Sequence, residues 1–261
     1  MSRFSLPGDD FSPEQIRQWF EDEQEGYFQL SGGAAREHHY RALNAYHAFD
    51  RLAGQHFERC LALGCAEGLE LEPIAGQVGE FIAIEPAKAW WRDTIGGTPA
   101  RYMAPNADAS MDLPSGHVNL IVCLGVLHHI PNVSAVLHEL GRVAAPGCTM
   151  VMREPHTNMG DSSKPRYGLT KNERGIPADW MIETAHRSGF DLVSAIPCDF
   201  SGTPRLAALI GMPIPYNSPA IVRMDAVLSR LTRPNRHYRR DAAWKKVAPA
   251  STFYTFRRRA G

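Results

Sequence analysis

The stretch "CLALGCAEGLELEPIA", residues 60 to 75, has the pattern of a buried strand that ends in a glycine turn and opens a helix. Gly64 closes the apolar run at a point where a side chain would obstruct a ligand, and Gly68 lets the next helix begin close by. Short glycine patterns also occur in ordinary bends, and Ala66 and Glu67 replace the glycine and small residue that a nucleotide-binding turn more commonly carries. The turn alone is therefore equally consistent with a cofactor site and with a plain strand-to-helix connection.

Strands and helices alternate from this turn to residue 155. The apolar runs predict strands at residues 59–64, 80–86, 117–127 and 145–155, with a weaker one at 100–109. The segments between them predict helices at residues 69–77, 88–95 and 133–144. This alternation predicts an α/β fold with a parallel, Rossmann-like sheet covered by helices on both faces. Ligands of such folds bind beyond the carboxyl ends of the strands.

The composition is that of a soluble globular chain. Of the 261 residues 44% are apolar and 21% charged, the net charge is +0, and five scattered cysteines form no CxxC pair. These values predict a cytoplasmic protein with reduced thiols and no metal site. The polar N-terminus and the absence of a long apolar run predict neither a signal peptide nor a membrane span. Oligomeric state cannot be read from the sequence.

The two ends of the chain differ from this core. Ser12 and Pro13 open a predicted helix, and a second helix is expected over residues 34–52, so residues 1–54 are predicted to form a helical cover or lid. Residues 55–261 are then the main domain. A helix at 178–189 and a strand at 190–197 precede a predicted insertion at 200–248, and "STFYTFRRR" at 251–259 reads as the terminal strand.

Polar residues stand at the predicted strand ends. Glu85 lies about 20 residues beyond the glycine turn, the offset at which a carboxylate reaches the hydroxyls of a ribose. Asp108 can accept a hydrogen bond from an adenine amine, and the N–H of Ala109 can donate to the adenine ring. His128 and His129 follow the fourth strand, where a histidine can act as a base or simply pack.

Taken in order, these pieces resemble the class I S-adenosylmethionine-dependent methyltransferases. "LALGCAEG" is similar to their glycine motif, Glu85 to their ribose-binding acid, "NADASMDLP" to their adenine segment and "VNLIVCLGVLHHI" to their fourth strand, within a UbiE-like core over about residues 55–155. The resemblance implies a seven-stranded sheet whose last strand is antiparallel, with S-adenosyl-L-methionine as cofactor. It implies cofactor contacts from these residues: Gly64, Cys65, Ala66, Glu67, Gly68, Glu85, Pro86, Asp108, Ala109, Leu124 and Gly125.

The glycine motif departs from this family at Ala66 and Glu67. If φ at Ala66 is positive, the strain is of order 1 kcal/mol and is expected to weaken cofactor binding. Glu67 can pair with the ammonium of the methionine moiety or face the acceptor.

The acceptor side is less defined. His156 and His129 are the predicted general bases for transfer to a hydroxyl, and Asp161, Arg166 and Arg174 the predicted acceptor contacts. The segment 153–177 weakly resembles bacterial methyltransferases of glycan assembly. We therefore predict an S-adenosylmethionine-dependent methyltransferase that acts on a small-molecule or sugar-like acceptor, at oxygen.

Two alternatives stay open, and a third is disfavoured by the glycine pattern. An RNA methyltransferase would use the basic segment "RLTRPNRHYRRDAAWKK", although the chain carries no net charge. A non-catalytic S-adenosylmethionine-binding protein would explain the altered turn. A nicotinamide-dependent oxidoreductase would require glycines at 64, 66 and 69, where this chain has Gly64, Ala66 and Leu69.

Overall fold

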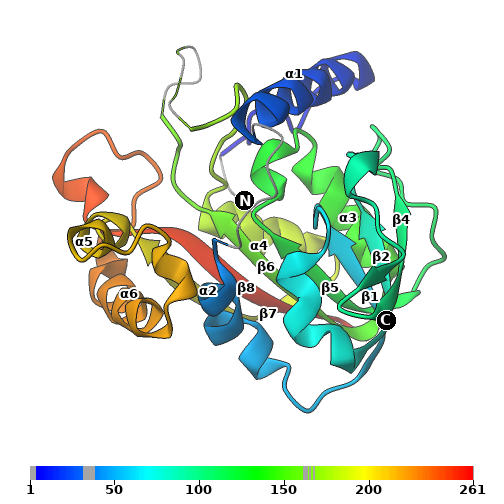
Figure 1. Cartoon of the computed structure of the whole chain (residues 1–261). Coiled ribbons are helices and arrows are strands. Elements are labelled where there is room, and N and C mark those ends of the chain that lie inside the picture. The colour runs from blue at the N-terminus through cyan, green and yellow to red at the C-terminus, as the bar shows by residue number, and fades with distance from the viewer. Residues whose placement is uncertain (1–3, 32–38, 161–163, 165, 167, 261) are drawn as a thin grey trace.

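The structure is a computed structural model that describes residues 4–31, 39–160, 164, 166 and 168–260. Its centre is an eight-stranded sheet in the order β3-β4-β2-β1-β5-β6-β8-β7 (Figure 1). The strands are β1 (Phe57–Leu63), β2 (Val78–Ile84), β3 (Thr94–Ile95), β4 (Thr98–Met103), β5 (Val118–Leu124), β6 (Ala144–Pro155), β7 (Phe190–Phe200) and β8 (Pro249–Arg258).

Strand directions agree with the fold that the sequence predicts. β4, β2, β1, β5 and β6 run parallel to one another, and β8 enters antiparallel between β6 and β7. The eighth strand is β3, which forms a short antiparallel pair with β4. The expected seven strands are therefore present, with one two-residue strand added at the edge.

Two apolar cores lie on the two faces of this sheet. The burial of nearly every position in the central strands explains their continuous apolar runs. One core receives α3 (Val133–Val143) and α4 (Ala178–Arg187), and also Leu6 from the N-terminal segment. The other receives α2 (Arg41–His47), the 3-10 helices η1 (Phe49–Arg51) and η2 (Leu69–Gln77), and α6 (Pro219–Thr232).

The N-terminal helix α1 (Pro13–Ser31) begins where the sequence predicts. Ser12 and Gln15 exchange side-chain and backbone hydrogen bonds in a capping box. Figure 1 shows α1 beside the loops at one end of the sheet, near α3. The indole of Trp19 in α1 donates to the carbonyl of His129, at 2.7 Å. The helix is thereby fastened to the carboxyl end of β5.

Two predicted helices differ in the structure. Residues 88–95 contain only the 3-10 turn η3 (Lys88–Trp90) and β3, because the Trp91 indole donates to the carbonyl of Glu85 and so turns the chain back. Tertiary hydrogen bonding overrides a weak helical preference here. The second N-terminal helix is shorter than predicted and breaks at Ala48, and its expected start at residues 34–38 lies outside the described residues.

The segment between β7 and β8 holds the remaining helical elements. Besides α6, these are α5 (Thr203–Leu209), η5 (Pro215–Asn217), η6 (Arg233–Asn235) and η7 (Trp244–Lys246). One more 3-10 helix, η4 (Leu127–His129), lies outside this segment and directly follows β5. In the part of the chain that the structure describes, no helix combines the length and apolar character required to cross a membrane. The domain boundaries at residues 54 and 55 stay a prediction.

Candidate functional site

The turn after β1 has an unusual backbone. Gly64, Ala66 and Gly68 all have positive φ, at +60°, +49° and +81°. A Cβ on Gly64 would lie 2.6 Å from the side chain of Val126, and one on Gly68 would lie 2.5 Å from Ile95. A side chain is therefore excluded at both glycines by steric clash as well as by the positive φ. Ala66 has a positive φ too, and its backbone is strained because only glycine adopts that conformation without cost.

Glu85 connects this turn to the end of β2. Its carboxylate is 3% exposed and accepts hydrogen bonds from the N–H of Ala66, at 2.9 Å, and of Ala87, at 3.0 Å. Burial raises the pKa of Glu85, and the two backbone hydrogen bonds act in the opposite direction. The glycine turn and the strand-end acid, predicted separately from the sequence, are therefore in direct contact.

Glu67 is paired within the chain, and its predicted contact with the cofactor ammonium or the acceptor stays a prediction. Its carboxylate lies 3.1 Å from the guanidinium of Arg92, in a partly exposed ion pair. The neighbouring Cys65 is held under Tyr102, and burial raises the pKa of its thiol to about 12. The hydroxyl of Tyr102 donates to the carbonyl of Ala66 at 3.0 Å. These contacts fix the shape of the turn.

The segment after β4 forms a compact turn of its own. Asp108 is exposed, and its carboxylate accepts hydrogen bonds from the N–H and hydroxyl of Ser110, which lower its pKa. The N–H of Ala109 donates to the carbonyl of Asn106, and φ at Ala109 is +68°. The adenine contacts predicted for Asp108 and Ala109 stay predictions, and the Ala109 N–H already has an acceptor within the chain.

A buried acid organises the end of β5. Glu154 in β6 is 1% exposed and accepts hydrogen bonds from the backbone N–H groups of Val126 and Leu127, at 2.9 and 2.8 Å. It also lies 2.8 Å from Nδ1 of His128. These hydrogen bonds lower the pKa of Glu154 although its burial acts to raise it. Because a carboxylate can only accept, Nδ1 of His128 carries a proton.

His129 has a comparable partner from the N-terminal helix. Its Nδ1 lies 2.8 Å from the carboxylate of Glu23 in α1, and its side chain is 24% exposed. Glu23 also accepts from the hydroxyl of Thr170 at 2.5 Å and from the N–H of Asn172 at 2.9 Å. Burial acts to raise the pKa of Glu23, but the hydrogen bonds outweigh it and the pKa is lowered.

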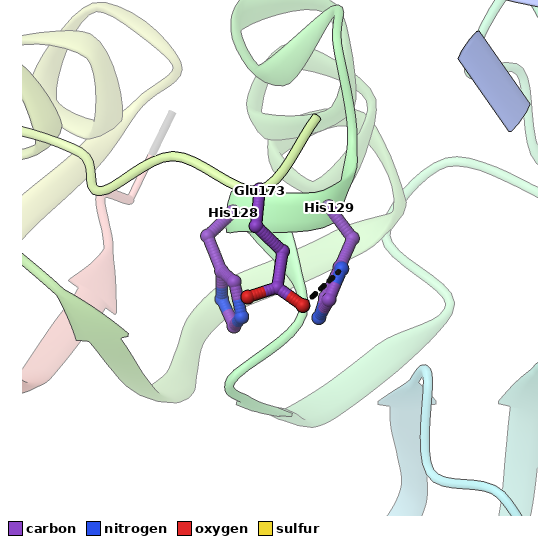
Figure 2. A group of neighbouring side chains, drawn as sticks. All are labelled: His128, His129 and Glu173. Atoms are coloured by element: carbon purple, nitrogen blue, oxygen red, sulfur yellow. Dashed lines mark ion pairs between the residues drawn. The ribbon is translucent and has the colours of Figure 1, made fainter. Parts of the chain in front are cut away.

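Glu173 completes this cluster, as Figure 2 shows. One of its carboxylate oxygens lies 3.6 Å from Nδ1 of His129, and ligand-type atoms of His128, His129 and Glu173 lie within 4.8 Å of one another. The two imidazole rings have centroids 4.1 Å apart. The sequence identified the two histidines but gave no sign of their carboxylate partners, which come from α1, β6 and the loop before α4.

His156 occupies a different environment. It is 2% exposed, its Nδ1 lies 2.8 Å from the hydroxyl of Thr252 in β8, and its Nε2 is buried without a hydrogen-bond partner among the described residues. Burial and the nearby guanidiniums of Arg236 and Arg240 lower its pKa to about 3. The ring is consequently neutral and enclosed.

The two arginines predicted to bind an acceptor are engaged with the backbone. Arg166 donates to four carbonyls within its own loop, those of Met159, Glu173, Thr170 and Lys171. Arg174 donates to the carbonyls of His128, Ile130 and Pro131 and stacks on Trp19. Their acceptor contacts stay predictions, and Asp161 lies outside the described residues.

The structure also has a cleft of about 500 Å³. Residues of the N-terminal segment, α3 and α4 line it, among them Asp9, His138 and Trp180. None of the predicted site residues contributes to its lining.

Comparison with known proteins gives a consistent family signal. A family model described as "Methyltransferase domain" matches residues 36–195, more than half of the chain. The ubiquinone biosynthesis O-methyltransferase of Aliivibrio fischeri is 22% identical over 140 residues, 52% of this chain and 59% of that protein. The match thus spans less than two thirds of that relative's length.

Solved structures share the fold at low identity. The cyclase SpnF has a TM-score of 0.58 and 14% identity, with 99% of this chain and 100% of that chain covered. An S-adenosylmethionine-dependent methyltransferase from Mesorhizobium loti has a TM-score of 0.52 and 13% identity, covering 82% and 97%. One of these two is described by a reaction other than methylation, so the likeness establishes the fold and leaves the chemistry to the site.

Proposed function

The chain belongs to the methyltransferase domain family, and from this premise we propose that it methylates a hydroxyl oxygen of a small-molecule or sugar-like acceptor. Its cofactor is S-adenosylmethionine, which supplies a methyl group already activated as a sulfonium. The protein then has to position the acceptor, exclude water and remove the hydroxyl proton. Transfer to oxygen is supported by the Aliivibrio fischeri relative, which is named as an O-methyltransferase.

The residues at the strand ends fit this cofactor. Gly64 and Gly125 present backbone without side chains, and a Cβ at Gly64 would meet Val126. A carboxylate offers about four acceptor positions. Two of those at Glu85 are taken by the N–H groups of Ala66 and Ala87, which leaves acceptor capacity for the hydroxyls of a ribose.

We therefore propose the cofactor contacts at the glycine turn and at the ends of β2, β4 and β5. The residues are Gly64, Cys65, Ala66, Gly68, Glu85, Pro86, Asp108, Ala109, Leu124 and Gly125. Glu67 remains a proposed contact of the same turn, and to reach the cofactor ammonium its carboxylate has to leave its ion pair with Arg92.

The single observation that carries the proposed reaction is the pair of His129 and Glu23. The lowered pKa of Glu23 keeps its carboxylate ionised, and it holds the proton of His129 on Nδ1. When the ring is in its neutral form with the proton on Nδ1, Nε2 carries the basic lone pair. His129 is one residue from His128, whose ring packs at Gly125, so the base stands beside the predicted cofactor edge. We assign proton removal to His129 rather than to the enclosed His156.

The test is a labelled-methyl transfer screen over sugars and small hydroxylated metabolites. With an acceptor found, His129→Gln and Glu23→Gln should each lower kcat, the former by about 10²- to 10⁴-fold, while the affinity for S-adenosylhomocysteine stays unchanged. His138→Gln, an exposed histidine of α3, serves as the matched control. Wild-type turnover in His129→Gln would refute the assignment of the base.

The two remaining alternatives predict different outcomes in the same screen. A non-catalytic protein would bind S-adenosylhomocysteine but transfer no methyl group to any acceptor. An RNA methyltransferase would label tRNA or rRNA and bind it in a salt-dependent way. One arginine of the basic segment is less available for this role, because Arg240 donates to Ser201 and to the carbonyls of Ala248 and Pro249.

A further inference from the structure

Arg153 is a buried arginine at the carboxyl end of β6. In the sheet it lies between Leu124 of β5 and Phe253 of β8, and it is 8% exposed. Alternation along the strand turns it to the face opposite Glu154, into the core that α2 covers. Its guanidinium carbon lies 3.9 Å from the ring centroid of Tyr40, directly before α2. The charged group thus lies over the face of an aromatic ring.

The hydrogen-bond capacity of this guanidinium is largely unused. A guanidinium has five N–H donors, and the one hydrogen bond that Arg153 makes within the described chain joins Nη1 to Oδ1 of Asn44, at 2.9 Å. Asn44 is oriented in turn, because its amide nitrogen donates to Glu70 at 3.2 Å. No carboxylate of the described residues lies within ion-pair distance of Arg153.

One buried acid on this face, Asp199, has other partners. Asp199 accepts hydrogen bonds from the hydroxyls of Tyr216, at 2.7 Å, and Ser251, at 3.2 Å. Burial raises the pKa of Asp199 and the charge of Arg153 acts to lower it, and no hydrogen bond joins the two groups in the described structure. The contrast with Arg174 is plain, because that guanidinium donates to three backbone carbonyls.

The unused side of the guanidinium reaches the predicted cofactor edge. Nη2 of Arg153 lies 3.4 Å from the position that a Cβ on Gly125 would occupy, and Cε1 of His128 lies 3.7 Å from the same position. Gly125 has φ of +73° and presents only backbone there. Arg153 and His128 therefore flank one glycine, at the end of the strand that leads to His129.

A buried cation without a counter-ion is costly unless something supplies the missing charge. Arginine suits a planar carboxylate, which it can bind through two parallel hydrogen bonds. We propose that Arg153 is an anion-binding residue of the site, which receives a carboxylate at Gly125 with Tyr40 and Asn44 fixing the guanidinium plane. The proposal rests on the proposed function, and the carboxylate belongs either to the methionine moiety of the cofactor or to the acceptor.

The experiment compares the wild type with Arg153→Met, which keeps the length and apolar packing of the side chain but removes the charge. Arg101→Met, at an exposed position of β4, is the control for loss of one positive charge. Unfolding midpoints first establish that both variants are folded. Isothermal titration with S-adenosylhomocysteine and with 5'-methylthioadenosine, which lacks the amino-acid part, then identifies a cofactor carboxylate. If that is the ligand, Arg153→Met weakens binding of the first by about tenfold or more and leaves the second unchanged.

The second arm uses sodium benzoate as the carboxylate probe, against sodium chloride at matched ionic strength. If the acceptor supplies the carboxylate, benzoate stabilises the wild type saturated with S-adenosylhomocysteine but not Arg153→Met. The proposal is overturned if Arg153→Met changes neither the affinity for S-adenosylhomocysteine nor the stabilisation by benzoate. It is also overturned if the variant weakens the binding of both nucleosides equally. Absence of S-adenosylhomocysteine binding by the wild type would instead reject the proposed function, while the benzoate comparison on the cofactor-free protein would still decide the role of Arg153.

Discussion

Replacing Ala66 with glycine should stabilise this protein. Ala66 has φ of +49°, and a non-glycine residue in that region carries a strain of about 1 kcal/mol relative to glycine. The turn is held on both sides, by the hydrogen bond from Ala66 N–H to Glu85 and by that from the Tyr102 hydroxyl to the Ala66 carbonyl. Both involve backbone atoms, so glycine retains them and the strain alone is removed.

The strain is present in the folded chain itself, so its cost falls on folding rather than on cofactor binding. We expect Ala66→Gly to raise the free energy of unfolding by about 1 kcal/mol, and the unfolding midpoint by about 2–4 °C. The affinity for S-adenosylhomocysteine should be unchanged. Urea unfolding with an unchanged m-value measures the first quantity and isothermal titration the second.

Ala87→Gly is the matched control for this experiment. Ala87 donates to the same carboxylate, but its φ is −90°, where alanine is unstrained. Glycine at that position should destabilise the fold by about 0.5–1 kcal/mol. If Ala66→Gly destabilises the protein as Ala87→Gly does, the assignment of backbone strain to Ala66 is wrong.

Three further predictions follow from the described contacts. Burial, with Arg51 nearby, lowers the pKa of His47 to about 4 from an ordinary value of 6.5. The neutral ring therefore contributes on the order of 3 kcal/mol of stability, fully present above pH 6.5 and lost as the pH falls towards 4. His47→Leu should flatten that part of the curve of unfolding free energy against pH, and an unchanged slope in the variant would contradict this prediction. Because proton removal by His129 requires no Lewis acid, EDTA should leave the transfer rate unchanged, and stimulation by added Zn²⁺ or Mn²⁺ would reveal a metal at His128, His129 and Glu173. Lys171→Ala, which removes an exposed ion pair with Asp22 of α1, should lower the unfolding free energy by less than about 1 kcal/mol, so a larger loss in urea unfolding would show that α1 depends on this pair.

The order of strand ends was the most predictable part of this protein. Apolar runs and glycine turns are local signals, and the contact between Glu85 and the turn at Ala66 follows from parallel strands meeting at one edge. The family and fold predicted from those pieces are confirmed by the family match and the sheet order. The helix expected at residues 88–95 was wrong because Trp91 donates to Glu85, a tertiary contact that no local pattern reports.

The pairs that complete the site were outside the reach of sequence patterns. Glu23 and His129 are 106 residues apart, and Asn44 and Arg153 are 109 apart. In the sequence, Glu23 stands in an acidic run that reads as a solvated helix face, and Arg153 reads as an ordinary residue after an apolar strand. Only the docking of α1 and α2 at the strand ends gives these side chains their partners.

The most direct test of the central claim is isothermal titration of S-adenosylhomocysteine against the wild type and Glu85→Gln. The replacement keeps the shape of the side chain but removes the charge that we propose to bind the ribose. We predict saturable one-site binding by the wild type and a loss of about 1–3 kcal/mol of binding free energy in the variant. Absence of binding by the folded wild type, or equal affinity in the two proteins, would contradict it.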